Sequence, residues 1–185
     1  MISNSNIESA FHAGGLLGTV STPTYINGAI VEGTKVESTG ENGIAGGIVA
    51  VATNPEERTC EVSIENSEVR AWTNSEDANA VAKQSEVKAL NHAGGMIGFT
   101  TVGEIKDSKV LNSKVTSTNG ISGAFAGVVS LTTSEINAQA DAAENGTTYT
   151  GRTVSKLMLS GSTIADVILA GLNYVNDYLG CGIIE

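Results

Sequence analysis

The sequence predicts an all-β protein, namely a right-handed parallel β-helix of about five layers with loop insertions. Three observations predict it. A Gly-rich apolar segment recurs along the chain, a six-residue pattern with apolar ends recurs between its copies, and the Ser, Asn and Gly of that pattern are poor helix formers. Short strands joined by corners cannot bury their apolar faces alone, but stacked copies can. The alternative fold class is a β-sandwich, which would need hairpin turns every ~8–12 residues.

The Gly-rich segment has three close copies and two looser ones. They lie at 13–17, 45–49, 93–97, 125–129 and 169–173. Alternate side chains are apolar on both faces, so we expect a strand that is covered on both sides. On one face the next side chains are small: Gly18, Ala50, Gly98 and Ser130. They predict that something approaches this face closely, either an insertion of the chain itself, a partner, or a second copy of the chain.

The second repeat has six residues with an apolar residue at each end. Its seven copies lie at 2–7, 31–36, 64–69, 82–87, 105–110, 110–115 and 159–164. The third residue is Asn, Asp, Gly or Gln, and the fourth is Ser or Thr. Asn, Asp and Gly tolerate the backbone conformations of a sharp turn, and a Ser or Thr hydroxyl can bond to backbone groups that the turn frees. We therefore expect strand, corner and strand, with both end residues pointing inward.

Three polar segments interrupt the repeats and are expected to lie on the surface. Residues 53–60 and 73–80 are predicted to be loops. Residues 133–150 include an Ala-rich stretch that predicts a short helix, which Asn145 and Gly146 would stop. These segments are where we expect recognition, because binding residues often lie on loops that a rigid scaffold positions.

The whole chain, residues 1–185, is expected to form a single repeat-built domain. An apolar pair, Ile183 and Ile184, stands next to the last residue. A solenoid needs capped ends to protect its edges, and no clear cap is visible at Met1. We therefore expect the domain to be excised from a larger protein.

The charge balance excludes several classes of function. The chain carries 10 Lys and Arg against 20 Asp and Glu, a formal net charge of −10. A protein that binds the phosphate backbone needs clustered cations, so nucleic acid is not an expected partner. No apolar run approaches the ~18 residues of a membrane span, and no signal peptide is visible. We expect no membrane insertion and, with two His and two Cys, no metal or cofactor site.

No motif of a zinc protease, phosphate-binding loop, dinucleotide site or activated serine occurs, so we expect no catalytic residue. His12 and His92 each precede Ala-Gly-Gly and are interpreted as corner residues, with paired metal ligands as the alternative. Cys60 and Cys181 are interpreted as two unpaired thiols. A disulfide between them in an oxidising compartment is the alternative.

Adjacent acidic residues in two predicted loops raise the possibility of an enzyme. Polysaccharide lyases and glycosidases occur on β-helices, and glycosidases use pairs of carboxylates. Glu56-Glu57 and Glu76-Asp77 are interpreted instead as solvated surface charge. Sugar-binding enzymes also favour aromatic platforms, and Trp72 is the one Trp of the chain.

The repeats resemble the GLUG-type repeat of bacterial surface proteins. The resemblance rests on Gly-Gly-Leu-Leu-Gly at 14–18 and Gly-Gly-Met-Ile-Gly at 94–98, each near Ser-x-Val hexads, and it covers about residues 2–175. That repeat occurs in adhesins and in the non-catalytic part of IgA-cleaving zinc metallopeptidases. The second copy has Ala50 and the fourth Ser130 where the repeat has its final Gly. The resemblance implies a β-helical module of a larger secreted or surface-anchored protein.

The expected function is structural and adhesive, without catalysis. The domain would be a rigid scaffold at the bacterial cell surface or outside the cell. It would present binding loops to a host protein or glycan, and it would contact neighbouring domains of the same polypeptide. The alternative is a carbohydrate-active β-helix enzyme, either a polysaccharide lyase or a glycosidase.

Overall fold

The computed structural model describes residues 1–53, 61–74, 81–151 and 154–174, and it confirms the all-β prediction. The described strands form four sheets, which we name A to D. Sheet A contains, in spatial order, β1 (Ile2–Ser3), β6 (Ile30–Glu32), β11 (Glu68–Arg70), β16 (Lys109–Leu111) and β20 (Thr163–Ala165). Sheet D contains β5 (Thr24–Asn27), β10 (Val62–Glu65), β15 (Val102–Lys106) and β19 (Lys156–Ser160).

Sheet B is the largest of the four because each passage of the chain contributes two strand segments to it. One half contains β2 (Asn6–Ser9), β7 (Lys35–Ser38) and β12 (Ser85–Ala89). The other half contains β3 (His12–Gly14), β8 (Ile44–Gly46) and β13 (His92–Gly94), and the long strand β17 (Ser113–Gly123) joins the halves and pairs with β21 (Ile168–Tyr174). Sheet C contains β4 (Leu17–Val20), β9 (Val49–Ala52), β14 (Ile97–Thr100) and β18 (Ala126–Val129).

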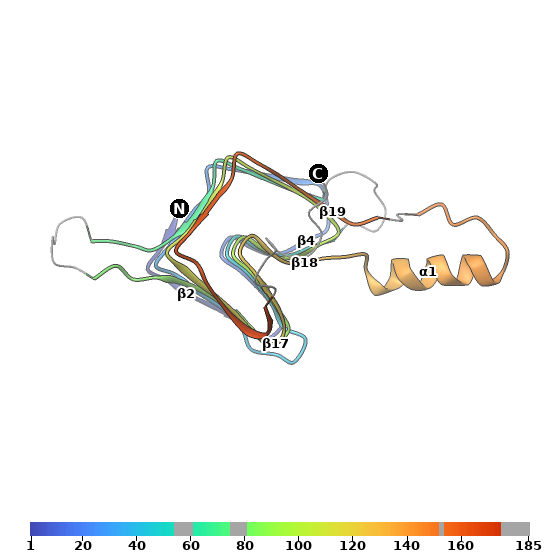
Figure 1. Cartoon of the computed structure of the whole chain (residues 1–185), viewed down its shortest axis with the longest axis horizontal. Coiled ribbons are helices and arrows are strands. Elements are labelled where there is room, and N and C mark those ends of the chain that lie inside the picture. Colours follow the sequence, from blue (N-terminus) through green and yellow to red (C-terminus); the bar gives the residue numbers. More distant parts are fainter. Residues whose placement is uncertain (54–60, 75–80, 152–153, 175–185) are drawn as a thin grey trace.

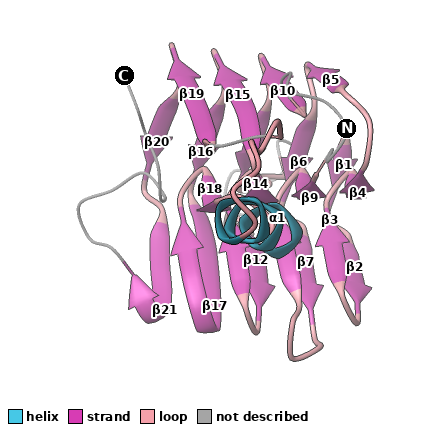
Figure 2. Ribbon diagram, turned by 90° about the vertical axis from the view of Figure 1, so that its right-hand side faces the viewer, coloured by secondary structure: helices cyan, strands magenta, loops and turns pink. Residues whose placement is uncertain are grey.

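The chain visits the sheets in one fixed order, A, B, C, D and then A again. We call one such passage a layer. Viewed down the stack, equivalent strands of successive layers overlie one another (Figure 1), and from the side they stand next to one another along the stack (Figure 2). Every ladder between the strands named above is parallel, and the one antiparallel pair among the described residues is the isolated bridge Trp72–Lys83. Hairpins of a β-sandwich do not fit these ladders.

The six-residue repeats form corners, as predicted. In six of the seven copies the third residue has a φ between 44° and 59°; these residues are Asn4, Gly33, Asn66, Asp107, Asn112 and Gly161. The copy at 82–87 is the exception, because Gln84 does not share the positive φ and Ala82 is exposed rather than buried. Gly28 and Asp166 form two further corners of this type. The pattern missed them because the next residue is Ala or Val instead of Ser or Thr.

The hydroxyl in the fourth position of a corner joins two layers. Six such hydroxyls donate to the backbone carbonyl two residues earlier at 2.7 to 3.1 Å; they belong to Ser5, Thr34, Ser67, Ser108, Ser113 and Ser162. Four of these hydroxyls also accept a backbone N–H from the preceding layer; they belong to Thr34, Ser67, Ser108 and Ser162. The N–H of Ala29 donates to Ser67 Oγ at 3.0 Å, and that of Ser67 donates to Ser108 Oγ at 3.1 Å. This hydroxyl ladder pairs backbone groups that the tight corners leave without sheet partners.

Replacing Ser108 with alanine is expected to lower the free energy of unfolding by about 1–3 kcal/mol. The side chain is fully buried, and its loss leaves the N–H of Ser67 and the carbonyl of Lys106 without this partner. Chemical denaturation followed by circular dichroism measures the change. Ala29→Ser is the matched control, because Ala29 occupies the first corner of the same column. Equal stability of Ser108→Ala and the unmodified chain would show that the ladder contributes nothing.

The Gly-rich segments are bends between two strands, so the prediction of one continuous strand is wrong. β8 ends at Gly46 and β9 begins at Val49, and the backbone bends at Gly47 and Ile48 between them. Ile48 and Val49 are both fully buried although they are adjacent in sequence. Burial of both sides follows from the change of backbone direction rather than from two covered faces of a strand.

Sheet C folds back closely onto sheet B, which explains the small residues. A Cβ atom at Gly98 would lie 2.7 Å from the carbonyl oxygen of Ala45, and one at Gly127 would lie 2.8 Å from that of Ala93. Real Cβ atoms do not come this close to backbone, so only small residues fit. The predicted close approach is confirmed, and the element that makes it is sheet B of the same chain.

The registers confirm the first three copies of the Gly-rich segment, since Ala13, Ala45 and Ala93 pair in one row. The fourth copy is misplaced in the sequence prediction. Ala93 pairs with Ser122, so this copy begins at Ser122 instead of Phe125, and Gly127 takes the place assigned to Ser130.

The fifth predicted copy of the Gly-rich segment, at 169–173, is also wrong. Leu169 pairs with Val115, and Gly171 pairs with Ser117. These partners lie in the first half of β17, which follows the corner from sheet A, whereas the Gly-rich bends follow the second half of sheet B.

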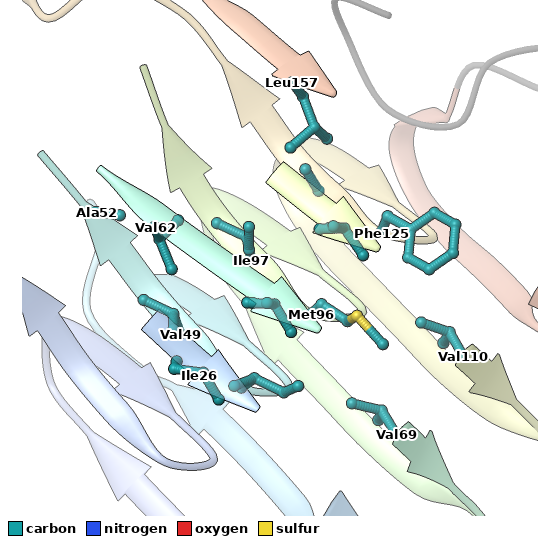
Figure 3. Packing of buried hydrophobic residues seen from close by; sticks show 14 of the residues in the cluster. Ile26, Val49, Ala52, Val62, Val69, Met96, Ile97, Val110, Phe125 and Leu157 are labelled. Atoms are coloured by element: carbon teal, nitrogen blue, oxygen red, sulfur yellow. The ribbon is translucent and has the colours of Figure 1, made fainter. Parts of the chain in front are cut away.

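Apolar side chains from successive layers stack into columns inside the molecule. The larger cluster includes Ile26, Val49, Met96 and Phe125 (Figure 3). A smaller cluster of Ala and Val lies along sheet B, and it consists of Ala13, Val36, Ala45, Val87, Ala89, Ala93 and Val115. The end residues of the corner repeats contribute to both clusters, which confirms their predicted inward direction in the inner layers.

The predicted helix in residues 133–150 is confirmed as α1 (Thr133–Glu144). Thr132 and Glu135 form a capping box at its start, and Asn145 caps its end, followed by Gly146 at φ 64°. The helix stands away from the stacked strands (Figure 1). Of the two predicted loops, only Thr53, Thr73 and Asn74 belong to the described residues.

Candidate functional site

A pocket of mixed polar and apolar lining lies at the corner where the chain passes from sheet A to sheet B in the first layers. Its volume is about 540 Å³. Eight residues line it: Asn4, Ser5, Asn6, Lys35, Ala82, Lys83, Gln84 and Glu86. One of them, Ala82, is apolar. We call it the corner pocket.

One wall of the corner pocket contains Ala82 and Lys83, and Lys83 lies beside Trp72. The backbone N–H of Trp72 donates to the carbonyl of Lys83, and the N–H of Lys83 donates to the carbonyl of Trp72, both at 2.9 Å. Trp72 packs on Gly33, where a Cβ atom would lie 2.5 Å from the Trp Cβ. Lys83 Nζ donates to Asn4 Oδ1 at 2.6 Å and thereby connects this wall to the first layer.

The opposite wall is the outer face of sheet B. Asn6, Lys35 and Glu86 pair in register, so they form one outward column over three layers. Lys35 forms an ion pair with Glu37 of its own strand, and Lys88 binds the same carboxylate at 2.8 Å. The hydrogen bond and charge of Glu37 raise the pKa of Lys35, and the two lysines lower the pKa of Glu37. Lys35 therefore remains charged and turned toward Glu37 at neutral pH.

Three lining side chains keep their polar groups available. Asn6, Gln84 and Glu86 are exposed and have no side-chain hydrogen bond or ion pair with any residue that the structure describes. Two amides and one carboxylate thus offer donors and acceptors toward the pocket.

His12 and His92 do not form a paired site. They stand in the same row of sheet B, two layers apart, with Ile44 between them. His12 Nδ1 lies 3.0 Å from Thr19 Oγ1, and His92 Nδ1 accepts the N–H of Ile121 at 3.3 Å. Burial lowers the pKa of both rings, which favours the neutral form.

Stability is expected to fall as the pH drops below about 6.5, and His92 should contribute to this loss. The folded chain lowers the pKa of His92, so the unfolded chain binds more protons in this range and gains free energy on acidification. Thermal melts between pH 8 and pH 5 measure the effect. His92→Ile, which copies the residue at position 44, is expected to flatten that dependence. Parallel curves for the variant and the unmodified chain would contradict the assignment.

Most of the other predicted candidates lie outside the described residues. These are Cys60, Cys181, Glu56, Glu57, Glu76 and Asp77. Within the described ranges, no group of three or more His, Cys, Asp or Glu side chains could hold a metal ion. No helix of those ranges is long and apolar enough to cross a membrane.

Glu61 is a buried acid that the sequence reasoning missed. It is 1% exposed, and its Oε2 accepts the N–H of Thr101 at 3.1 Å and the hydroxyl of Thr100 at 3.3 Å. These bonds connect Glu61 to the corner between sheets C and D. Thr100 and Thr101 belong to the neighbouring layer, so these bonds join two layers.

The corner pocket was also missed, although the corner repeats at 2–7 and 82–87 were recognised. The pocket exists because Lys83 reaches Asn4 across 79 positions of sequence. The sequence feature that could have indicated the pocket was Gln84. It is the one residue in the third position of the six-residue repeats that is not Gly, Asn or Asp.

Comparison with known proteins adds nothing to this geometry. No family model, curated protein or solved structure matches the chain. The resemblance to the GLUG-type repeat therefore enters the functional argument as a proposal.

Proposed function

We propose that the chain is a non-catalytic structural and adhesive module, built as a parallel β-helix and belonging to a secreted or cell-surface bacterial protein. The observation that carries this proposal is the fixed order of sheets A, B, C and D through successive layers with parallel, in-register ladders. A continuous coil is the simplest backbone path that returns to the same four sheets in that order. The bacterial surface origin is supported by the GLUG-type resemblance of the repeats.

Rigidity supports the scaffold role. Beyond the ladders, outward charges connect neighbouring layers: Arg70 pairs with Glu32 at 3.0 Å, and Lys109 pairs with Glu68 at 3.2 Å. Each exposed pair contributes little energy, at most about 1 kcal/mol. Their alternation across the layers favours one register over its neighbours. A stiff framework of this kind suits the presentation of a binding surface.

The test of this function is binding without turnover. The purified chain, immobilised, is offered a panel of host proteins and glycans, and the same chain in solution is incubated with polysaccharides. We expect saturable binding and no release of reducing ends or unsaturated products. Turnover that disappears when Glu56, Glu57, Glu76 or Asp77 is replaced would overturn the proposal in favour of a carbohydrate-active enzyme.

A further inference from the structure

We propose that the corner pocket binds an uncharged saccharide unit. The inference rests on the proposed function, since it names the ligand class that such a module would hold. It is argued from the polar groups of the pocket, from their existing partners and from the local charge.

The available groups match the hydroxyls of a sugar. Each sugar hydroxyl can donate one hydrogen bond and accept others, so its binding site needs both donors and acceptors. The amides of Asn6 and Gln84 supply both kinds, and the carboxylate of Glu86 supplies strong acceptors. The aliphatic parts of Lys35 and Lys83 and the methyl group of Ala82 add carbon surface, which can pack against the C–H groups of a sugar ring.

The charges favour an uncharged sugar over an acidic one. The two lysines of the lining are already engaged, Lys83 by Asn4 and Lys35 by Glu37. Glu86 presents a carboxylate, and the chain as a whole carries a net charge of −10. The carboxylate of Glu86 and the net negative charge of the chain disfavour a uronic or sialic acid.

The walls are already in place before a ligand arrives. Asn6, Lys35 and Glu86 project from paired strands, and Lys83 is held by its backbone bridge to Trp72 and by its bond to Asn4. The volume of about 540 Å³ lies within the usual range for small-ligand pockets. A preformed site loses less conformational entropy on binding, which suits a ligand that is held mainly by hydrogen bonds.

The experiment is ligand-observed NMR titration of the full chain with lactose, cellobiose and maltose as uncharged probes and sialyllactose as the acidic probe. We expect at least one uncharged probe to bind more tightly than sialyllactose. Asn6→Ala combined with Gln84→Ala is expected to weaken that binding by about tenfold or more. Both side chains are exposed, so the variant should keep its fold, which circular dichroism checks.

Lys114→Ala is the matched control. Lys114 pairs with Glu86 in the same outward column but lies outside the corner pocket, and its replacement should leave the affinity within about twofold. The inference is overturned if no uncharged probe binds, if sialyllactose binds more tightly, or if the Asn6 and Gln84 changes leave the affinity unchanged. Protein or glycan binding elsewhere on the chain would keep the adhesive proposal, whereas turnover of a polysaccharide would overturn that proposal instead.

Discussion

Replacing Gly47 with valine is expected to prevent the chain from folding. A Cβ atom at this position would lie 2.0 Å from the carbonyl oxygen of Gly95 in the next layer and 3.0 Å from a methyl group of Val69. The first contact is impossible for a real Cβ atom and is made with backbone, and the second is tighter than normal packing. We expect a loss of more than about 4 kcal/mol of stability. Far-ultraviolet circular dichroism and thermal melting of the purified variant measure it.

Gly28→Asn is the control for this substitution. Gly28 has φ 70°, a Cβ atom there would have no other atom within 4 Å, and the equivalent corner of the next layer carries Asn66 at φ 48°. Asparagine tolerates this conformation, so the variant should fold with near-normal stability. A Gly47→Val protein that melts with the unmodified chain would contradict the close contact between layers.

Replacing Ile64 with alanine is expected to cost about 2–5 kcal/mol. Ile64 is fully buried in a column that runs from Ile26 through Ile64 and Ile105 to Leu159. Removing the side chain deletes buried methyl groups and leaves a cavity between two layers that cannot collapse easily. Urea denaturation followed by circular dichroism gives the change in unfolding free energy.

Leu159→Ala is the comparison within the same column. Leu159 stands in the last layer and is only partly buried, so its truncation should cost less than that of Ile64. A gradient from the middle of the stack toward its end is expected for a core made of columns. Equal losses at the two positions would argue for a core that is not organised by layers.

The corners were the most predictable part of the fold. Asn, Asp and Gly adopt a positive φ more readily than other residues, so the local sequence was sufficient to predict the corners. The corners at Gly28 and Asp166 were not predicted, because the sequence pattern also required Ser or Thr as the next residue. At Gly28 the next residue is Ala29, whose N–H still donates to Ser67 Oγ of the following layer.

The Gly-rich bends were less predictable, because contacts with the neighbouring layer determine which residues fit there. Gly95 lies where a Cβ atom would meet the carbonyl of Ala124, whereas the equivalent place in the next layer is occupied by Ala124 itself. The residue types of the motif therefore change from layer to layer, while the backbone path stays the same. Sequence similarity alone moved the fourth copy by three positions.

The candidate site could not be predicted from the local sequence. Its walls come from the first, second and third layers, and they meet where Lys83 bonds to Asn4. No single stretch of sequence contains the pattern of the corner pocket. What the sequence could indicate was where polar insertions leave the repeats.

The hydroxyl ladder has a consequence for how such a chain changes length during evolution. Each serine bonds within its own layer and to the layer before it, and to nothing farther away. Duplicating or deleting one whole layer would therefore preserve every bond except those at the junction. Selection could lengthen or shorten the molecule in steps of one layer without redesigning its interior.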